Sequence, residues 1–289
     1  MPELPEVTAL AVFLDGALAG RSVARIDLAA LSVLKTYEPP LTALEGRSIR
    51  GVRRMGKFLI LDTEDASLVM HLARAGWIQW RDEMPVDPPR PGKGPLALRL
   101  LAVSAEGELA GGFDLTEAGT KKGAAAYVVR EVGEVPGIAR LGPDALDPAL
   151  TPEALAAVLT SQGRSQIKGV LREQSVIAGI GNAYSDEILH AARISPYAPA
   201  EVVDASALYD AMHAVLEDAC GSALAAGIPR LKAEKKAHLR VHGRTGQPCP
   251  VCGDTIREVS YADRSLQYCP TCQTGGKLLA DRRMSRLLK

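Results

Sequence analysis

The sequence predicts an α+β protein with several domains: a helix and a β-sandwich or barrel, then a helical region, then a small metal-bound hairpin. Three observations support this fold class. Short, partly alternating apolar runs follow one another between residues 20 and 130 with no helical pattern among them, which favours stacked or closed sheets. The pattern becomes helical after residue 150. Four cysteines with paired spacing lie near the C-terminus.

The first element is a helix from Pro5 to Leu18, and Gly20 is its expected stop. The strands are expected in the runs Val23 to Val33, Phe58 to Asp62, Leu68 to Trp80, Leu96 to Val103 and Ala124 to Val129. Turns are expected at glycines 46, 51, 56, 76, 107, 111 and 112. Residues 81–95 contain five prolines and are expected to form a loop.

A stretch rich in Pro, Gly and Asp near residues 134–152 predicts a linker. After it, Thr151 can cap a helix whose first residue is Pro152. Asp204 can cap a second helix, which runs from Ala205 to Ala226 and ends before a glycine. Between these two, a tight turn at AGIGNA (residues 178–183) is flanked by further helical segments.

Composition indicates a globular, water-soluble chain, with 47% hydrophobic and 24% charged residues. No run of 18 apolar residues appears, and the acidic start does not resemble a signal peptide, so we expect an intracellular protein with no membrane partner. The net charge is zero, but residues 230–289 hold 13 Lys or Arg against 5 Asp or Glu. This basic segment either meets phosphate groups or is a solvated tail.

Four of the five cysteines follow the pattern Cys249-x2-Cys252-x16-Cys269-x2-Cys272. Two such CxxC pairs can supply four thiolates to one tetrahedral, structural Zn²⁺, and the alternative is a pair of disulfides, which an intracellular setting disfavours. The fifth, Cys220, shares a helical stripe with apolar residues and is expected to pack in a core. Between the pairs we expect a hairpin with Arg264 at its tip, which suits a phosphate clamp or is an exposed turn residue.

The opening residues MPELPEV raise a chemical possibility. Removal of Met1 would make Pro2 a terminal secondary amine, and an α-amino group titrates near ~7.7–8.0, so it is a ready nucleophile at neutral pH. Condensation with a sugar aldehyde carbon would give an iminium, and Glu3 could move the protons. The alternative is structural: Pro5 suits the first turn of a helix and Pro2 is merely the chain end.

Three separated motifs resemble the formamidopyrimidine-DNA glycosylase/endonuclease VIII family of base-excision repair enzymes. They are PELPEV at the start, GIGNAYSDEIL at 179–189, and the four-cysteine finger with Arg264. Three further segments occur in the family's order, namely RRMGKFLIL at 53–61, RLGP at 140–143 and VHGRTGQPC at 241–249. The resemblance implies an N-terminal helix plus β-sandwich, a helix-two-turn-helix domain and a C-terminal four-cysteine zinc finger, with DNA crossing between the halves.

The resemblance also implies roles for four catalytic residues. Pro2 matches the nucleophile that attacks C1′ and forms a Schiff base, and Glu3 matches the acid/base at the opening sugar. Lys57 matches the lysine assigned to β-elimination. Arg264 matches the finger arginine linked to phosphate binding and δ-elimination.

DNA contacts are implied for a second group of residues. Asn182 matches the phosphate-binding asparagine of the two-turn element. The glycines before it, including Gly181, are expected to offer backbone N–H groups to the same phosphate. Lys168 matches a basic residue near the site. His71 is expected either to approach a phosphate or to be a hydrogen-bonded structural histidine. Arg74, in HLARAG, replaces the methionine that fills the gap left by the flipped base, and could instead bond the orphaned opposite base.

Other departures concern lesion choice. The Arg-x-Phe element of the family is missing, residues 228–240 are short for a loop that caps an extruded oxidised purine, and His242 stands where tyrosine is usual. The start PELPE nevertheless favours the purine-lesion branch over the endonuclease VIII branch, which more often begins PEGPE. These signals conflict about the preferred lesion.

The combined prediction is a bifunctional DNA glycosylase and apurinic/apyrimidinic lyase that removes oxidised bases and nicks by β,δ-elimination. It would bind one structural Zn²⁺ and act as a monomer on damaged or abasic double-stranded DNA in the bacterial cytoplasm, at the nucleoid. The expected domains are 1–133 (catalytic sandwich), 134–150 (linker), 151–240 (helix-two-turn-helix), 241–275 (zinc finger) and 276–289 (basic tail). The alternatives are a non-catalytic damaged-DNA binder, an endonuclease VIII type enzyme acting on oxidised pyrimidines or abasic sites, and an unrelated zinc-ribbon interaction protein.

Overall fold

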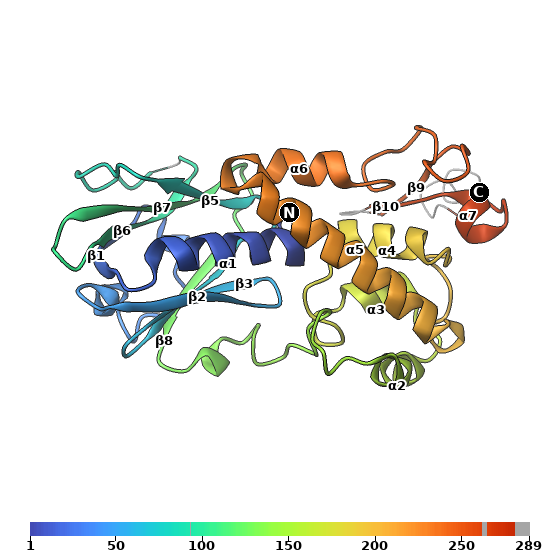
Figure 1. Ribbon diagram of the computed structural model, residues 1–289, viewed down its shortest axis with the longest axis horizontal. Helices are drawn as coiled ribbons and strands as arrows, with labels where there is room; N and C mark the ends of the chain where they lie inside the picture. The colour runs from blue at the N-terminus through green and yellow to red at the C-terminus, as the bar shows by residue number, and fades with distance from the viewer. Residues whose placement is uncertain (93, 262–264, 281–289) are drawn as a thin grey trace. The chain divides into compact units, whose positions relative to one another are not determined.

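The computed structural model describes residues 1–92, 94–261 and 265–280, and it divides into two compact units (Figure 1). The first unit comprises Met1–Arg140 together with Cys220–Glu234. The second comprises Leu141–Ala219 together with the chain from Lys235 onward. Each unit is therefore built from two separate stretches of sequence.

The N-terminal helix α1 (Leu4–Leu18) is the first element of unit 1, in agreement with the sequence prediction. Pro5 lies in its first turn, where a missing N–H costs nothing, and Glu6 lies in the same turn, near the positive end of the helix dipole. The Glu3 N–H donates to Glu6 Oε2 at 2.7 Å, which satisfies a donor that the helix itself leaves unpaired. Gly20, with φ +79°, ends the helix.

The sandwich of unit 1 consists of two four-stranded antiparallel sheets in the described part of the chain, which confirms the predicted fold class. One sheet has the order β1-β6-β7-β5 and the other β2-β3-β4-β8. The strands are β1 (Ser22–Leu28), β2 (Ile49–Met55), β3 (Phe58–Thr63), β4 (Ser67–His71), β5 (Gly76–Arg81), β6 (Leu96–Val103), β7 (Leu109–Glu117) and β8 (Ala125–Val129). Helix α1 packs on β2 and β3 (Figure 1).

The structure corrects the strand prediction in three places. The run Val23–Val33 ends as a strand at Leu28, and residues 31–33 form a 3₁₀ turn. The run Leu68–Trp80 is two strands, because the chain turns at Ala73, whose φ is +50°. Strands β2 and β7 lie where Gly51, Gly111 and Gly112 predict turns. Gly112 instead lies within β7, which pairs with β6. Glycine is required at this position because a Cβ would collide with the Leu100 carbonyl of the paired strand.

One hydrophobic core holds unit 1 together, and it draws on the helix and on both sheets. Leu10 and Leu14 of α1, Leu59 and Leu61 of β3, and Leu100 of β6 are fully buried in the same cluster. Helix α1 is therefore fixed along its length, because its apolar face is part of this core. Its outer face leaves Val12 and Phe13 exposed.

The second unit is helical, as predicted. Its helices are α2 (Pro152–Gln162), α3 (Ile167–Arg172), α4 (Asn182–Ala191) and most of α5 (Ala205–Ala226), and the short helix α6 (Leu231–His238) joins it from unit 1. The predicted caps are confirmed, because Thr151 Oγ1 accepts from the Ala154 N–H and Asp204 Oδ1 accepts from the Ser206 and Ala207 N–H groups. Cys220 is partly exposed, not buried as expected, and Ala219 takes the buried position beside it.

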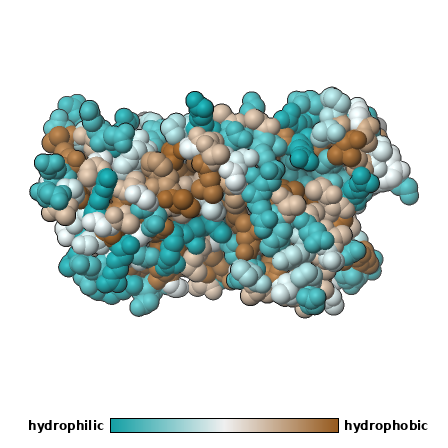
Figure 2. Space-filling view, in the orientation of Figure 1, coloured by the Kyte–Doolittle hydropathy of each residue, from teal (hydrophilic) through white to brown (hydrophobic). Residues whose placement is uncertain are grey.

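The C-terminal hairpin of unit 2 is also confirmed. Strands β9 (Arg257–Ser260) and β10 (Ser265–Tyr268) pair in antiparallel register, and helix α7 (Pro270–Thr274) follows. No described helix is long and apolar enough to cross a membrane. On the face shown in Figure 2, hydrophilic side chains cover most of the surface, and hydrophobic ones occur in small groups.

Candidate active site and zinc centre

The first two site residues lie at the start of α1. Pro2 and Glu3 are both buried, Glu3 with 1% exposure, whereas Met1 is 42% exposed. Met1 is therefore at the surface, while the two residues that follow it are buried at the start of the helix. The structural role expected for Pro5 is confirmed, because it lies in the first turn of α1.

Lys57 and His71 are brought together by the register of one sheet. Lys57 lies in the tight turn between β2 and β3, with 9% exposure, and the next residue, Phe58, pairs with His71 on β4. The Phe58 and His71 rings lie 4.8 Å apart. Burial and, secondarily, the Lys57 charge lower the pKa of His71 to about 4, so its imidazole is neutral at pH 7. Its Nδ1 accepts the Ala73 N–H at 3.3 Å.

Arg74 follows in the turn between β4 and β5. Its side chain is exposed, whereas that of Lys57 is buried. The preceding residue, Ala73, has a left-handed backbone conformation, which reverses the chain at this turn. Lys57, His71 and Arg74 therefore lie within one pair of turns and strands of unit 1.

The DNA-binding residues expected in unit 2 lie on α3 and α4. The Lys168 ammonium is buried and donates to Asp186 Oδ1 at 2.6 Å, to Ser185 Oγ at 2.9 Å and to the Asn182 carbonyl at 3.1 Å. Asp186 is fully buried and its other oxygen lies 2.7 Å from His242 Nδ1. The Lys168 ammonium thus lies within a hydrogen-bonded network. Asp186 links it to the imidazole of His242, which is 25% exposed.

The turn before α4 differs from the expectation in one respect. The Gly179 N–H donates to Gln174 Oε1 at 3.1 Å, so this group is occupied and does not offer itself to a phosphate. Gly181 is the N-cap of α4 and Asn182 its first residue. Asn182 Nδ2 donates to the Ser265 carbonyl at 2.8 Å, which ties the helix start to the zinc-finger hairpin, and its buried Oδ1 has no partner among the described residues.

Two residues that the sequence prediction missed, Asp186 and Glu187, organise this part of the unit. The Glu187 carboxylate is buried and accepts three backbone N–H groups, from Arg240, Val241 and His242, at 2.8 to 3.0 Å. Burial raises the pKa of Glu187, and the three N–H groups oppose that rise. The signal in the sequence was the position of these two acidic residues directly before the apolar pair Ile188 and Leu189, which places the carboxylates close to a buried part of the helix.

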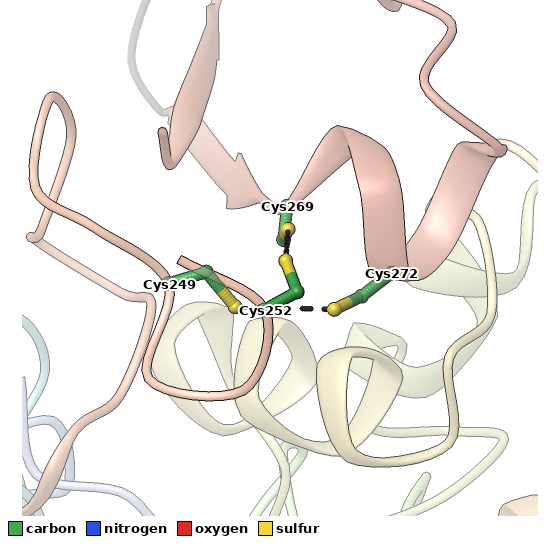
Figure 3. Close-up of side chains that lie close together, drawn as sticks. All are labelled: Cys249, Cys252, Cys269 and Cys272. Carbon is green, nitrogen blue, oxygen red and sulfur yellow. Dashed lines mark hydrogen bonds between the residues drawn. The ribbon is translucent and has the colours of Figure 1, made fainter. Parts of the chain in front are cut away.

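The four cysteines converge as predicted (Figure 3). Their sulfur atoms all lie within 4.8 Å of one another, with Cys252 and Cys269 at 3.3 Å and Cys249 and Cys272 at 3.9 Å. Tetrahedral zinc with bonds of ~2.3 Å requires sulfurs about 3.8 Å apart, so the donor set fits this ion. Burial raises the pKa of Cys272 to about 11 when no cation is present, and a bound cation would favour the thiolate form of this ligand.

The hairpin places its strands on either side of residues 262–264, so Arg264 lies outside the described residues. The neighbouring Ser265 is described and is the residue whose carbonyl accepts from Asn182. The strand that begins at Ser265 ends at Tyr268, and Cys269 follows directly. The metal site and the hairpin are therefore parts of one short segment.

Three family models match the chain in sequence order. The formamidopyrimidine-DNA glycosylase N-terminal domain matches residues 1–110, the formamidopyrimidine-DNA glycosylase H2TH domain matches residues 141–229, and the zinc finger found in FPG and IleRS matches residues 246–275. The first match contains the helix and most of the sandwich, and the last contains all four cysteines.

Curated relatives agree with these models. The Moorella thermoacetica formamidopyrimidine-DNA glycosylase is 36% identical over 273 residues, which covers 90% of this chain and 94% of that protein. An uncharacterized formamidopyrimidine-DNA glycosylase-like protein of Mycobacterium tuberculosis is 60% identical over 152 residues, which covers 52% of this chain and 94% of that protein.

Solved structures are similar over nearly the whole chain. Lactococcus lactis formamidopyrimidine-DNA glycosylase, bound non-covalently to DNA containing an AP site, aligns with a TM-score of 0.77 and 26% identity. MutM in complex with DNA containing carbocyclic 8-oxo-G aligns with a TM-score of 0.79 and 26% identity. Each alignment covers 94% of this chain and 100% of the other.

A sandwich unit headed by a buried Pro-Glu pair, together with a helical unit that carries a four-cysteine finger, defines a zinc-finger protein of the H2TH class. The chain belongs to the formamidopyrimidine-DNA glycosylase family.

Proposed function

We propose that this protein is a base-excision-repair DNA glycosylase that also cleaves the strand as a lyase, through a Schiff base on Pro2. The observation that carries the proposal is the match of all three family models in order, with Pro2 and Glu3 buried at the start of α1. The solved relatives hold DNA with an abasic site or an oxidised guanine, so we propose damaged double-stranded DNA as the partner.

The proposed chemistry starts once Met1 has been removed. The lone pair of the Pro2 nitrogen forms a bond to C1′ of the damaged nucleotide, the bond from C1′ to the base breaks, and the base takes up the proton that the Pro2 nitrogen loses. Glu3 protonates the sugar ring oxygen as the ring opens, which leaves a positively charged iminium between Pro2 and C1′. Because the iminium withdraws electrons, a proton at C2′ becomes acidic and its removal expels the 3′ phosphate.

Two cations are assigned to the elimination steps. We propose that Lys57, in the tight turn beside His71, supports β-elimination, and that Arg264 at the finger tip binds phosphate and supports δ-elimination. The position of Lys57 beside His71 supports a phosphate approach here, because His71 Nδ1 accepts the Ala73 N–H and Nε2 is then the nitrogen that carries the proton of the neutral ring and can donate a hydrogen bond.

In the second unit we propose that Asn182 and Gly181 grip the DNA backbone, and that Lys168, whose buried ammonium donates to the Asn182 carbonyl, supports this contact by positioning the start of α4. We propose that His71 and Arg74 contribute from unit 1. Asn182 and Gly181 form the start of α4, where the helix dipole favours phosphate. Arg74 is exposed, which suits a contact to the base left unpaired by extrusion. We further propose that residues 1–133 carry the chemistry, that residues 151–275 hold the duplex, and that the enzyme works as a monomer in the bacterial cytoplasm.

Borohydride trapping tests the Schiff base directly. The protein, with loss of Met1 verified by mass spectrometry, is mixed with abasic, 8-oxoguanine, formamidopyrimidine and oxidised-pyrimidine duplexes and reduced. We expect a covalent protein–DNA band with at least one duplex, and its absence with all four would contradict the proposal. The incision rates on the same duplexes identify the preferred lesion.

Matched variants separate the catalytic residues from general charge effects. Glu3→Gln should lower the rate of base release by ~10²-fold or more, the usual contribution of a general acid/base, while the exposed Glu108→Gln should leave it unchanged. Lys57→Met should slow strand cleavage more than base release, and Lys35→Met, on an exposed lysine, should slow neither. Equal effects within either pair would contradict the assigned roles.

The non-catalytic damaged-DNA binder remains the second candidate, because Arg74 replaces the usual wedge residue. A gel assay that distinguishes a shifted duplex from a nicked one separates the two. A shifted, uncleaved product with every lesion would support the binder.

A further inference from the structure

His190 is a buried titratable residue that the proposed glycosylase chemistry does not use. It lies near the C-terminal end of α4 with 4% exposure, and its Nε2 is 3.3 Å from Cys249 Sγ. That distance is within the range of a hydrogen bond to sulfur. Cys249 is itself 3% exposed, so the contact is shielded from water on both sides.

A zinc ion held by four thiolates needs hydrogen-bond donors beside the sulfur atoms, and His190 can be one of them. A doubly charged cation held by four thiolates carries a net double negative charge, and burying such a charge is costly unless donors point at the sulfurs. The Val251 N–H, 3.5 Å from Cys249 Sγ, is one such donor. A metal-bound thiolate has no proton to give, so a hydrogen bond between Cys249 and His190 must have the imidazole as its donor.

We propose that His190 is a positioning residue of the zinc centre: its Nε2–H donates to the thiolate of Cys249, and this bond orients Cys249 and slows the loss of the metal. The inference does not depend on the glycosylase activity, because it concerns only the metal and its ligands.

Helix α4 holds His190 in this position, because the residues on either side of it are part of the same helix. Within unit 2, α4 is joined to the finger at both ends, by Asn182 to the hairpin and by His190 to the metal site.

The test compares three variants of the full-length, zinc-loaded protein. His190→Leu removes the donor but keeps an apolar side chain of similar volume, and His190→Gln keeps an N–H at nearly the same place. His213→Leu is the matched control, since His213 is a partly buried histidine whose ring contacts Tyr209 and whose Nδ1 faces Glu217. Zinc release into a chelator is followed with a colorimetric indicator.

Loss of a hydrogen bond to a metal ligand typically weakens metal binding 10–100-fold, so zinc release from His190→Leu should be ~10-fold or more faster than from wild type. His190→Gln and His213→Leu should stay within about 3-fold of wild type. In the cobalt-loaded proteins, the sulfur-to-cobalt absorption band should shift for His190→Leu only. Equal release rates and spectra for His190→Leu and wild type, or equally fast release from the Leu and Gln variants, would overturn the proposal.

A measurement on the wild-type protein covers the case in which His190→Leu does not fold. Nitrogen NMR of histidine-labelled, zinc-loaded protein reports which ring nitrogen of His190 carries the proton. A protonated Nε2 supports the donor role, and an unprotonated Nε2 overturns it.

Discussion

The sandwich of unit 1 and the zinc finger of unit 2 are held together by different forces. The sandwich has a continuous apolar core in which Leu10, Leu59 and Leu100 are fully buried. The finger has two small apolar clusters, one of which contains the ligands Cys249 and Cys269 themselves. A segment of this size cannot bury enough apolar surface to fold alone. Metal binding must therefore supply the folding free energy that apolar burial supplies in the sandwich.

The helical part of unit 2 uses a third device. Lys168, Asp186, Glu187 and His242 are charged or polar groups held inside the unit by one another and by backbone N–H groups. Such a network fixes geometry, but it is sensitive, because removal of one member leaves another charge without a partner.

Loss of the metal should have the largest effect and should be confined to the finger. Cys269→Ser removes a buried ligand, and structural zinc contributes an apparent ~10–16 kcal/mol to the folding of small zinc modules. Hydrogen exchange should therefore show residues 246–275 unprotected while strand β3 keeps its protection. Slow exchange in the finger of Cys269→Ser would show that its apolar clusters keep it folded without the metal. The finger and the sandwich would then be stabilised in the same way.

The buried ionic network should give the next largest effect. Asp186→Asn keeps the size of the side chain but leaves the Lys168 ammonium uncompensated, so the free energy of unfolding should fall by about 3–5 kcal/mol. Urea denaturation measures the change. Glu217→Gln removes an acid that is 68% exposed and contacts His213, and it should change stability by less than about 0.5 kcal/mol. Similar values for the two variants would mean that the network is not a structural device.

A cavity in the sandwich should cost less than the broken ionic network and act only on unit 1. Leu59→Ala should lower the free energy of unfolding by about 3 kcal/mol, whereas Leu31→Ala, at a side chain that is 84% exposed, should change it by less than about 0.5 kcal/mol. The rate of zinc release should be the same in both variants. Faster release from Leu59→Ala would show that the finger depends on the core of the sandwich.

The smallest expected effect is a pH dependence that distinguishes the units. His71 has its pKa lowered from 6.5 to about 4 in the folded protein, chiefly by burial, so the unfolded chain binds the additional proton between these values. The contribution of His71 is complete above pH 6.5 and is lost as the pH falls toward 4. Unit 1 should lose about 2 kcal/mol between pH 7 and pH 5 through this group.

His71→Gln should remove that part of the pH dependence, as measured by urea denaturation at several pH values. An unchanged pH profile in the variant would assign the dependence to other groups. The rate of zinc release is the corresponding measurement for unit 2. His71→Gln should leave this rate unchanged at every pH.

Much of the fold could be predicted from the sequence because local signals and the final structure agree. Helix α1, the caps at Thr151 and Asp204, and the cysteine hairpin follow from residues near one another in the chain. The strands β2 and β7 could not be predicted, because Gly51 and Gly112 resemble turn residues until the close approach of a neighbouring backbone or side chain is known. Similarly, Cys220 was expected in the core, yet the packing of α5 turns it partly outward.

The candidate site divides in the same way. Residue type and spacing alone predicted the four-cysteine cluster, because each CxxC pair places two sulfurs close together. Pro2, Glu3 and Asn182 became candidates through the sequence motifs that contain them, and their roles stay predictions. Only the tertiary structure decided that Lys168 reaches Asp186, that His71 lies beside Lys57 as a neutral ring, and that His190 contacts Cys249. The physical reason is that burial and pairing set the charge and direction of a polar side chain, and both depend on residues that are distant in the sequence.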